Sequence, residues 1–312
     1  MFSAPIPIFF SCDDHYIAYC AVALRSLIDN ADPARTYHIH ILNTGLSPAG
    51  QTRVSQMARE NVRIFFDDVT DAMKQIGEML DLRDYYTAAI YFRVFIPRLF
   101  PQYEKGIYLD SDVVVPGDIS RLYDRELGDC LVGAVADDII ASRQVFIDYA
   151  ERGCGIAHTE YFNSGVLLMN LAAMREYDLE GKYIALLTRY RFNTICPDQD
   201  YLNVLCYGRV LPLPKGWNKM SIDRDYAGMP DIIHYNMFAK PWQHDGIAYG
   251  EVFWQYAQKT AFYAEIVAAR RAFGKGDEEK QESGLAELVR RAGEIADSER
   301  NCRTVLFAGV RV

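Results

Sequence analysis

Long apolar runs are missing from this chain. No stretch of about 18 apolar residues occurs anywhere, and the N-terminus lacks the basic segment and apolar core of a secretory signal. We therefore predict a protein that neither crosses a membrane nor is exported by a recognisable signal. The expected location is the cytoplasm, with at most peripheral contact with the inner face of the membrane.

Three further absences exclude classes of ligand. The seven cysteines form no CxxC pair, which favours reduced thiols in a cytosolic compartment. No G-x-G-x-x-G motif is present, which argues against a nicotinamide or flavin dinucleotide. The net charge is −9, the pI is about 5.2 and no long Lys/Arg run occurs, so nucleic acid is not an expected partner. An acidic protein that binds an anionic ligand needs a divalent cation between the two.

The first 140 residues alternate between strand-like and helix-like segments. Apolar runs at 7–11, 37–42 and 62–66 are typical of buried strands, and apolar residues recur at helical spacing over 16–30. Ser47-Pro48 predicts a helix start between the second and third strands. This order favours right-handed crossovers and an α/β fold, with a Rossmann-like, mainly parallel central sheet and helices on both faces.

The rest of the chain adds elements and then changes composition. We expect strands at 106–115, 131–136 and 166–170, and helices at 87–100, 198–207 and 251–273. From residue 274 the sequence GKGDEEKQESG predicts a charged linker, followed by a short amphipathic helix at 285–300 and a strand-like end, TVLFAGVRV. We therefore divide the chain into a main domain, 1–273, and a C-terminal segment, 274–312.

Two aspartates interrupt the apolar strand IYLDSDVVV. Asp110 and Asp112 are two residues apart on an extended chain, so both carboxylates point to the same side. Neighbouring anions at the end of a buried strand repel unless a cation lies between them, and hard oxygen ligands suit Mg²⁺ or Mn²⁺. In an open α/β sheet, ligands bind at that edge. The alternative is that one aspartate caps the next turn while the other meets an arginine or solvent.

A histidine and a lysine in DIIHYNMFAKPW are candidates to complete this site. A single histidine after a strand is more often structural than a ligand. Together with Asp110 and Asp112, however, His234 would leave three octahedral positions for diphosphate oxygens and water, and an imidazole favours Mn²⁺ over Mg²⁺. Lys240, fixed before Pro241, is placed to put its ammonium on a phosphate.

Other polar segments are candidates for the rest of a substrate site, each with a structural alternative. Asp13 can accept from a nucleobase or ribose while Tyr16 stacks on the base, or the acid can cap the first helix. Asn163 lies in YFNSG, where asparagine is usually a turn former. The acids of 198–200 suit a helix start, or they hold sugar hydroxyls. Arg93 lies among apolar residues and requires an acidic or phosphate partner.

In order and spacing, these segments resemble glycosyltransferase family 8, which includes glycogenin and bacterial lipopolysaccharide galactosyl- and glucosyltransferases. The resemblance covers about residues 5–245 and runs through SCDDHY, YFRVFIPRLFP, YLDSDVVV, YFNSGVLLMN, PDQDYLN and IHYNMFAKPW. It implies a GT-A fold over 1–273, a UDP-hexose donor (glucose or galactose), Mn²⁺ with Mg²⁺ as the alternative, and transfer with retention of configuration. The implied acceptor is a glycan or glycolipid such as lipopolysaccharide.

The resemblance also implies roles by position. Asp110, Asp112 and His234 match the metal ligands, and Lys240 matches a diphosphate contact. Many members carry glycine at the position of Met237, so a shifted loop is expected here. The other implied contacts are Asp13, His15, Tyr16, Asp110 and Ser111 with the nucleotide, and Arg93, Asp137, Asn163, Gln199 and Asp200 with the donor sugar, with Asp137, Gln199 and Asp200 as catalytic candidates.

The expected chemistry is departure of UDP assisted by the metal and Lys240. We favour front-face attack by the acceptor, with the leaving phosphate taking its proton, over a covalent intermediate on Gln199 or Asp200. Two alternatives remain at this stage. The strand with Asp110 also resembles the nucleophile motif of haloacid dehalogenase-type phosphatases, although about 100 residues precede it and His234 would be unused. A nucleotide-sugar-binding module without turnover is the other.

Overall fold

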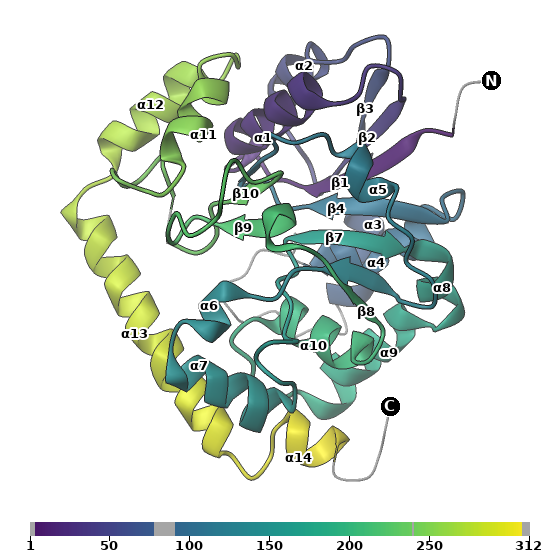
Figure 1. Cartoon of the computed structure of the whole chain (residues 1–312), viewed down its shortest axis with the longest axis vertical. Helices are drawn as coiled ribbons and strands as arrows, with labels where there is room; N and C mark the ends of the chain where they lie inside the picture. The colour runs from purple at the N-terminus through teal and green to yellow at the C-terminus, as the bar shows by residue number, and fades with distance from the viewer. Residues whose placement is uncertain (1–3, 78–90, 239, 308–312) are drawn as a thin grey trace.

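A mixed sheet forms the centre of the molecule (Figure 1). The structure, a computed structural model, describes residues 4–77, 91–238 and 240–307. Within these residues a seven-stranded sheet has the order β3-β2-β1-β4-β7-β6-β8. Its strands are β1 (Ile6–Ser11), β2 (Tyr37–Asn43), β3 (Val62–Asp68), β4 (Lys105–Leu109), β6 (Val132–Ala134), β7 (Val166–Asn170) and β8 (Val210–Pro212).

Most neighbouring strands of this sheet are parallel, which confirms the predicted α/β class. The pairs β3–β2, β2–β1, β1–β4 and β6–β8 are parallel, while β7 runs antiparallel to both β4 and β6. The helices are α1 (Ile17–Asn30), α2 (Pro48–Ser55), α3 (Thr70–Gly77), α4 (Phe92–Leu99), α5 (Ser120–Tyr123), α6 (Asp138–Ala141), α7 (Gln144–Asp148), α8 (Leu171–Glu176), α9 (Leu179–Ala185), α10 (Pro197–Cys206), α11 (Gly250–Ala257), α12 (Tyr263–Ala272), α13 (Lys275–Asp297) and α14 (Cys302–Leu306).

Alternate side chains of the buried strands enter two separate apolar cores. Phe9 of β1 packs with α4, α8, α9 and α10 on one face of the sheet, while its neighbours Ile8 and Phe10 pack with α1 and α11 on the other. The same alternation holds along β4, where Tyr108 faces the first core and Leu109 the second. Both faces of the sheet are therefore covered, as expected for strands that read as continuous apolar runs.

A second, smaller sheet brings distant segments to the carboxyl end of β4. The predicted strand at 106–115 divides at Asp110-Ser111-Asp112, and its continuation β5 (Val113–Val114) leaves the central sheet. Within the described chain β5 joins β10 (Ile233–His234) and β9 (Lys219–Met220) in the order β5-β10-β9. Because β10 is antiparallel to β5 with His234 opposite Val113, the histidine arrives beside the aspartate pair.

The second half of α13 confirms most of the helix expected at 285–300, but the C-terminal prediction was wrong for the linker and for the strand-like end. The expected linker at 274–284 is the first half of α13, a 23-residue helix. Its acids and lysines are good helix formers, and Gly274 starts the helix, where its amide donates to Asp277 (3.1 Å). The strand-like end begins as α14, which Asn301 caps by accepting from the Thr304 amide (3.0 Å); residues 308–312 lie outside the described residues.

Two other predicted elements differ from the structure or fall partly outside it. The single helix expected at 251–273 is two helices, α11 and α12. Residues 87–90 of the helix expected at 87–100 lie outside the described residues, and α4 covers its second half. A division of the chain at residue 273 would fall between α12 and α13 and stays a prediction. Among the described residues, no helix combines the length and apolar composition needed to cross a membrane.

A completely buried carboxylate joins α10 to the neighbouring segments. Asp200 accepts hydrogen bonds from the Tyr149 hydroxyl (2.7 Å), the Tyr161 hydroxyl and the Cys196 amide (3.0 Å). Burial raises the pKa of Asp200 to about 6, although these hydrogen bonds lower it. Asp200, a catalytic candidate in the sequence prediction, is thus enclosed in the protein core.

We expect Asp200→Asn to change how stability depends on pH. An unfolded aspartate has a pKa of about 3.9, so between pH 4 and 6 the native state binds the extra proton. The contribution of Asp200 to the free energy of unfolding therefore falls by about 3 kcal/mol as the pH rises through that window. In urea unfolding, the free energy of unfolding of wild type minus that of D200N should therefore fall by up to that amount between pH 4 and 6. A difference independent of pH would contradict this.

Candidate active site

The aspartate pair lies in a loop that the backbone holds on both sides. The Asp110 amide donates to the Gly165 carbonyl (2.8 Å), at the start of β7. The Asp112 carbonyl accepts from the Tyr235 amide (3.0 Å), directly after β10. These two bonds place the carboxylates between β7 and β10.

Asp110, Asp112 and His234 form a cluster that could hold a metal ion. One ligand atom from each lies within 4.8 Å of the others. Nε2 of His234 is 3.2 Å from Oδ1 of Asp112 and 3.9 Å from Oδ2 of Asp110. Two carboxylates and one imidazole are an appropriate ligand set for a divalent cation such as Mn²⁺ or Mg²⁺.

A chain of amides determines which nitrogen of His234 carries the proton. Asn163 donates to the Asp137 carboxylate (3.0 Å), which can only accept, so its oxygen points the other way and accepts from Asn218 (2.9 Å). The oxygen of Asn218 then faces Nδ1 of His234 (2.9 Å). Nδ1 therefore carries the proton, and the lone pair of Nε2 points toward the aspartates.

The carboxylate oxygen that faces this lone pair has no hydrogen-bond donor of its own among the described residues. Oδ1 of Asp112 is buried and accepts no hydrogen bond among the described residues. A buried acceptor next to an imidazole lone pair is costly unless a positive charge lies between them. The residues present thus fit a divalent cation, and this fit comes from the arrangement of atoms and not from the motif alone.

Arg93 is a buried partner of the aspartate loop. Its guanidinium donates to Asp110 (2.9 Å) and to the Ser164 carbonyl (2.6 Å), and it lies 3.5 Å from Asp198. Burial alone would lower the pKa of Arg93, but the carboxylates of Asp110 and Asp198 keep it raised. The arginine therefore stays charged and orients Asp110.

Lys240 and Tyr16 lie on the other side of the aspartate loop. The Lys240 ammonium forms an ion pair with Oδ2 of Asp112 and is almost completely buried. Burial acts to raise the pKa of Asp112, but the Lys240 ammonium holds it well below its usual range. Lys240 also lowers the pKa of the Tyr16 hydroxyl, although burial and nearby carboxylates raise it overall. Because the Tyr16 ring is 40 % exposed, it has a free surface beside the charged centre.

A small pocket opens beside the metal cluster. It encloses about 170 Å³ and includes Asp110, Asp112 and His234 in its wall. That is below the roughly 300–1,000 Å³ of pockets for drug-sized ligands, so it is matched to a single ring and not to a whole nucleotide. We call Asp137, Asn163 and Gln199 the polar side of the pocket; Asn236 is a further polar residue of the lining, and the apolar lining includes Ile139, Ile140, Phe146, Ile195 and Leu288.

The polar side of the pocket is one hydrogen-bonded unit. Oδ1 of Asp137 accepts from the Ile139 amide (2.8 Å) at the start of α6, and Oδ2 accepts from Asn163 and Gln199 (3.0 Å each). The Gln199 oxygen accepts from the Ser164 amide (2.9 Å). The positions of these three side chains are consequently interdependent.

Several sequence-predicted residues have structural partners and lie outside the pocket. Ser111 donates to the Ser11 carbonyl (2.8 Å), and Asp200 is enclosed by tyrosines. Asp13 accepts from the amides of His15 (3.0 Å) and Tyr16 (2.9 Å) in the turn before α1, but the N-cap position of the helix is Tyr16, so Asp13 does not cap it as the sequence alternative expected. His15 is exposed and does not line the pocket.

Three residues of the site escaped sequence reasoning, and Asp198, which the sequence offered as a helix-start acid or a sugar contact, has a different neighbour. Asn218 orients His234, Asp198 lies near Arg93, and Gly165 packs against both kinds of metal ligand. Asn236 lines the pocket, and its buried side-chain oxygen has no partner among the described residues. Asp198 and Gly165 stand inside motifs that were recognised, whereas Asn218 carried no signal of its own.

Met237 adopts a backbone conformation that favours glycine. Its φ is +51°, its side chain is partly exposed, and it lines the pocket. Such a conformation is unfavourable for a residue with a Cβ atom, by about 1–2 kcal/mol. The loop therefore keeps a glycine-type backbone at this position even though the side chain is large.

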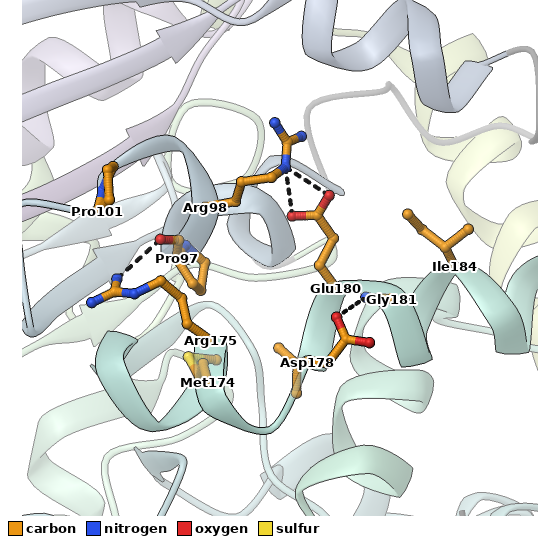
Figure 2. A pocket seen from close by; sticks show the side chains of 10 residues that line it. Pro97, Arg98, Pro101, Met174, Arg175, Asp178, Glu180, Gly181 and Ile184 are labelled. Carbon is orange, nitrogen blue, oxygen red and sulfur yellow. Dashed lines mark hydrogen bonds and ion pairs between the residues drawn. The ribbon is translucent and has the colours of Figure 1, made fainter.

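A larger cavity lies away from this chemistry. It encloses about 460 Å³ between α4 and α8–α9 (Figure 2). The charged side chains there pair locally: Arg98 with Glu180 (2.8 Å), Arg175 with the Pro97 carbonyl (3.0 Å), and Asp178 with the Gly181 amide (3.3 Å). We assign the active site to the smaller pocket because the metal cluster and the buried unpaired oxygens are found there.

The family follows from comparison with known sequences. The model of glycosyl transferase family 8 matches residues 7–246, which contain every residue of the metal cluster and the polar side of the pocket. The chain belongs to this family. It is therefore classed as a glycosyltransferase and not as a haloacid dehalogenase-type phosphatase.

Relatives of this family 8 glycosyltransferase include bacterial enzymes of glycan synthesis. A putative glycosyltransferase of Haemophilus influenzae is 27 % identical over 75 % of this chain and 69 % of its own length. The lipopolysaccharide 1,2-glucosyltransferase of Escherichia coli is 26 % identical over 75 % and 71 %. These coverages include most of each relative.

Solved structures agree with the family. The galactosyltransferase LgtC, in complex with donor and acceptor sugar analogues, matches with a TM-score of 0.67 and 27 % identity over 82 % of this chain and 96 % of its own. The bifunctional glycosyltransferase WbbM matches with a TM-score of 0.72 and 27 % identity over 87 % of this chain but only 53 % of its own. This family 8 chain thus has the expected GT-A fold.

We expect Gly165→Ala to weaken metal binding. A Cβ atom at this position would overlap the His234 ring and lie 2.5 Å from Oδ2 of Asp110, so both ligands would have to move. The affinity for Mn²⁺, measured by calorimetric titration, should fall at least about tenfold. Gly250→Ala is the control, because its Cβ would meet its nearest neighbour at 3.4 Å. A folded G165A protein with unchanged Mn²⁺ affinity would show that the cluster is not the metal site.

Proposed function

We propose that this family 8 glycosyltransferase moves a hexose, glucose or galactose, from UDP to a glycan or glycolipid acceptor in a Mn²⁺-dependent reaction with retention of configuration. The observation that carries the proposal is the pairing of the His234 lone pair with the orphaned oxygen of Asp112. A site built for a cation, next to a buried ammonium and a pocket the size of a sugar ring, suits a nucleoside diphosphate sugar. The relatives that act on lipopolysaccharide and the neighbour with bound sugar analogues support this substrate class.

Different residues of the site are placed to bind different parts of the substrate. Asp110, Asp112 and His234 would hold the metal, which when bound supplies Lewis-acid stabilisation of the leaving diphosphate. Lys240 offers a second positive charge to the same diphosphate, and Tyr16 offers an exposed ring for the base. The sugar then occupies the pocket, with its hydroxyls on the side of Asp137, Asn163 and Gln199.

The arrangement favours front-face attack over a covalent intermediate. The Gln199 oxygen accepts from the Ser164 amide, and both oxygens of Asp200 accept from surrounding donors in the core. Neither side chain presents a free nucleophile to the pocket. In the proposed step the acceptor hydroxyl bonds to the anomeric carbon, the bond from that carbon to the diphosphate breaks, and the proton passes to the leaving phosphate oxygen.

The proposal is tested by UDP release. With UDP-glucose or UDP-galactose and Mn²⁺, wild type should release UDP, and EDTA should abolish the release. Asp112→Asn should lose about 100-fold or more of this activity, because several kcal/mol of metal-dependent stabilisation are removed. Asp124→Asn, which alters a surface ion pair with Arg35, is the control and should keep the wild-type rate.

Two outcomes would overturn the proposal in different ways. Binding of Mn²⁺ and UDP without metal-dependent UDP release from any UDP-hexose would indicate a binding module that has lost turnover. Release that persists in EDTA would exclude the metal role. Where an acceptor is found, the configuration of the new glycosidic bond, determined by NMR, tests retention.

A further inference from the structure

Helix α13 lies outside the segment that defines the family. The family match ends at residue 246, whereas α13 covers Lys275–Asp297. In Figure 1 this helix runs along the flank of the molecule, from the end of α12 past α6 and α7 to α14. The proposed function, on which the following inference rests, uses no residue of this helix.

The first half of α13 is attached to the segment that follows the metal histidine. Gln281 donates to the side-chain oxygen of Gln243 (3.0 Å), and its own oxygen lies 2.7 Å from Nε2 of His244. One turn later, a Cβ atom built on Gly284 would be in van der Waals contact with Phe238 (3.8 Å). The helix therefore packs against the loop that contains Met237 and Lys240.

The second half of α13 is attached to another part of the pocket wall. Arg291 donates to the Thr194 carbonyl (2.9 Å), next to Ile195 in the pocket wall. Ala292 and Ile295 are buried in the core that contains α7 and α10. The positions 281, 284, 288, 292 and 295 follow helical spacing, so one face of α13 makes all of these contacts.

Leu288 is on this face, between the two attachments, and it lines the active-site pocket. Its side chain is half-buried and packs against the core cluster on that side. With Ile139, Ile140 and Phe146 it forms an apolar wall in the pocket whose polar side contains Asp137, Asn163 and Gln199. A sugar ring has both a hydroxyl-bearing edge and a C–H face, so a pocket with one polar and one apolar side suits it.

We propose that Leu288 is a substrate-binding residue, which contacts the C–H face of the donor sugar and excludes water from the anomeric carbon. Water is the competing nucleophile at that carbon. Its oxygen would bond to the anomeric carbon as the bond to the diphosphate breaks, and its proton would pass to the leaving phosphate, so that free hexose and UDP are formed. A wall that excludes water therefore favours transfer over hydrolysis.

The test compares Leu288→Ala with Leu285→Ala, the same change three residues earlier on α13 and outside the pocket lining. Leu288→Ala should weaken binding of UDP-hexose by about tenfold and leave binding of UDP unchanged, because only the sugar contact is lost. It should also raise the rate of UDP release in the absence of an acceptor. Leu285→Ala should do neither, and Leu288→Met, which nearly conserves volume, should restore wild-type behaviour.

A second measurement is independent of activity. Cys196 lines the same pocket and is half-buried, as is Cys130, which lies outside it. Labelling with N-ethylmaleimide, followed by peptide mass spectrometry, should be faster at Cys196 in L288A than in wild type and unchanged at Cys130. This comparison tests the wall even if wild type fails to release UDP, which would count against the proposed function alone.

The inference is overturned if folded L288A labels Cys196 at the wild-type rate and binds UDP-hexose as wild type does. It is also overturned if L288A weakens UDP and UDP-hexose equally, because Leu288 would then act only through the stability of the fold. Thermal unfolding of all three variants identifies a loss of stability.

Discussion

The active site depends on a two-residue pairing between β5 and β10. The ladder places His234 opposite Val113, and the amide of the next residue, Tyr235, donates to the Asp112 carbonyl. These backbone bonds join segments more than a hundred residues apart and so fix the position of the imidazole. Electrostatics alone would not keep two carboxylates together, since they repel unless cations are near them. Here the backbone holds them in place beside Lys240 and Arg93.

Hydrogen bonds connect the candidate metal cluster to the polar side of the pocket. Asp137 fixes the amide of Asn163, which fixes Asn218, which in turn fixes the protonated nitrogen of His234. A change at the polar side of the pocket is therefore transmitted to the imidazole that faces the metal position. The two parts of the substrate would be recognised by one network, which accounts for so many buried amides in a small volume.

Patterns with local causes could be predicted from the sequence, and contacts between distant segments could not. The buried strands and the shared orientation of Asp110 and Asp112 follow from side-chain alternation. Asn218 was missed because its role depends on the orientation of His234, which no local pattern encodes. The charged segment after Gly274 looked like a linker, but its helix gains stability from packing that composition does not reveal. Family resemblance supplied the roles, and the geometry separated residues that line the pocket, such as Asp137, Asn163 and Gln199, from others that do not, such as Asp13, Ser111 and Asp200.

The left-handed backbone at Met237 has a consequence for how such pockets diversify. Met237 lines the cavity and is not one of the candidate metal ligands, so exchanging its side chain would alter the interior of the cavity, and glycine would suit the backbone there best. Volume and polarity beside Asp110, Asp112 and His234 could thus vary at a position that is not among them. In this chain, Met237 is therefore a place where substrate preference could change separately from cation binding.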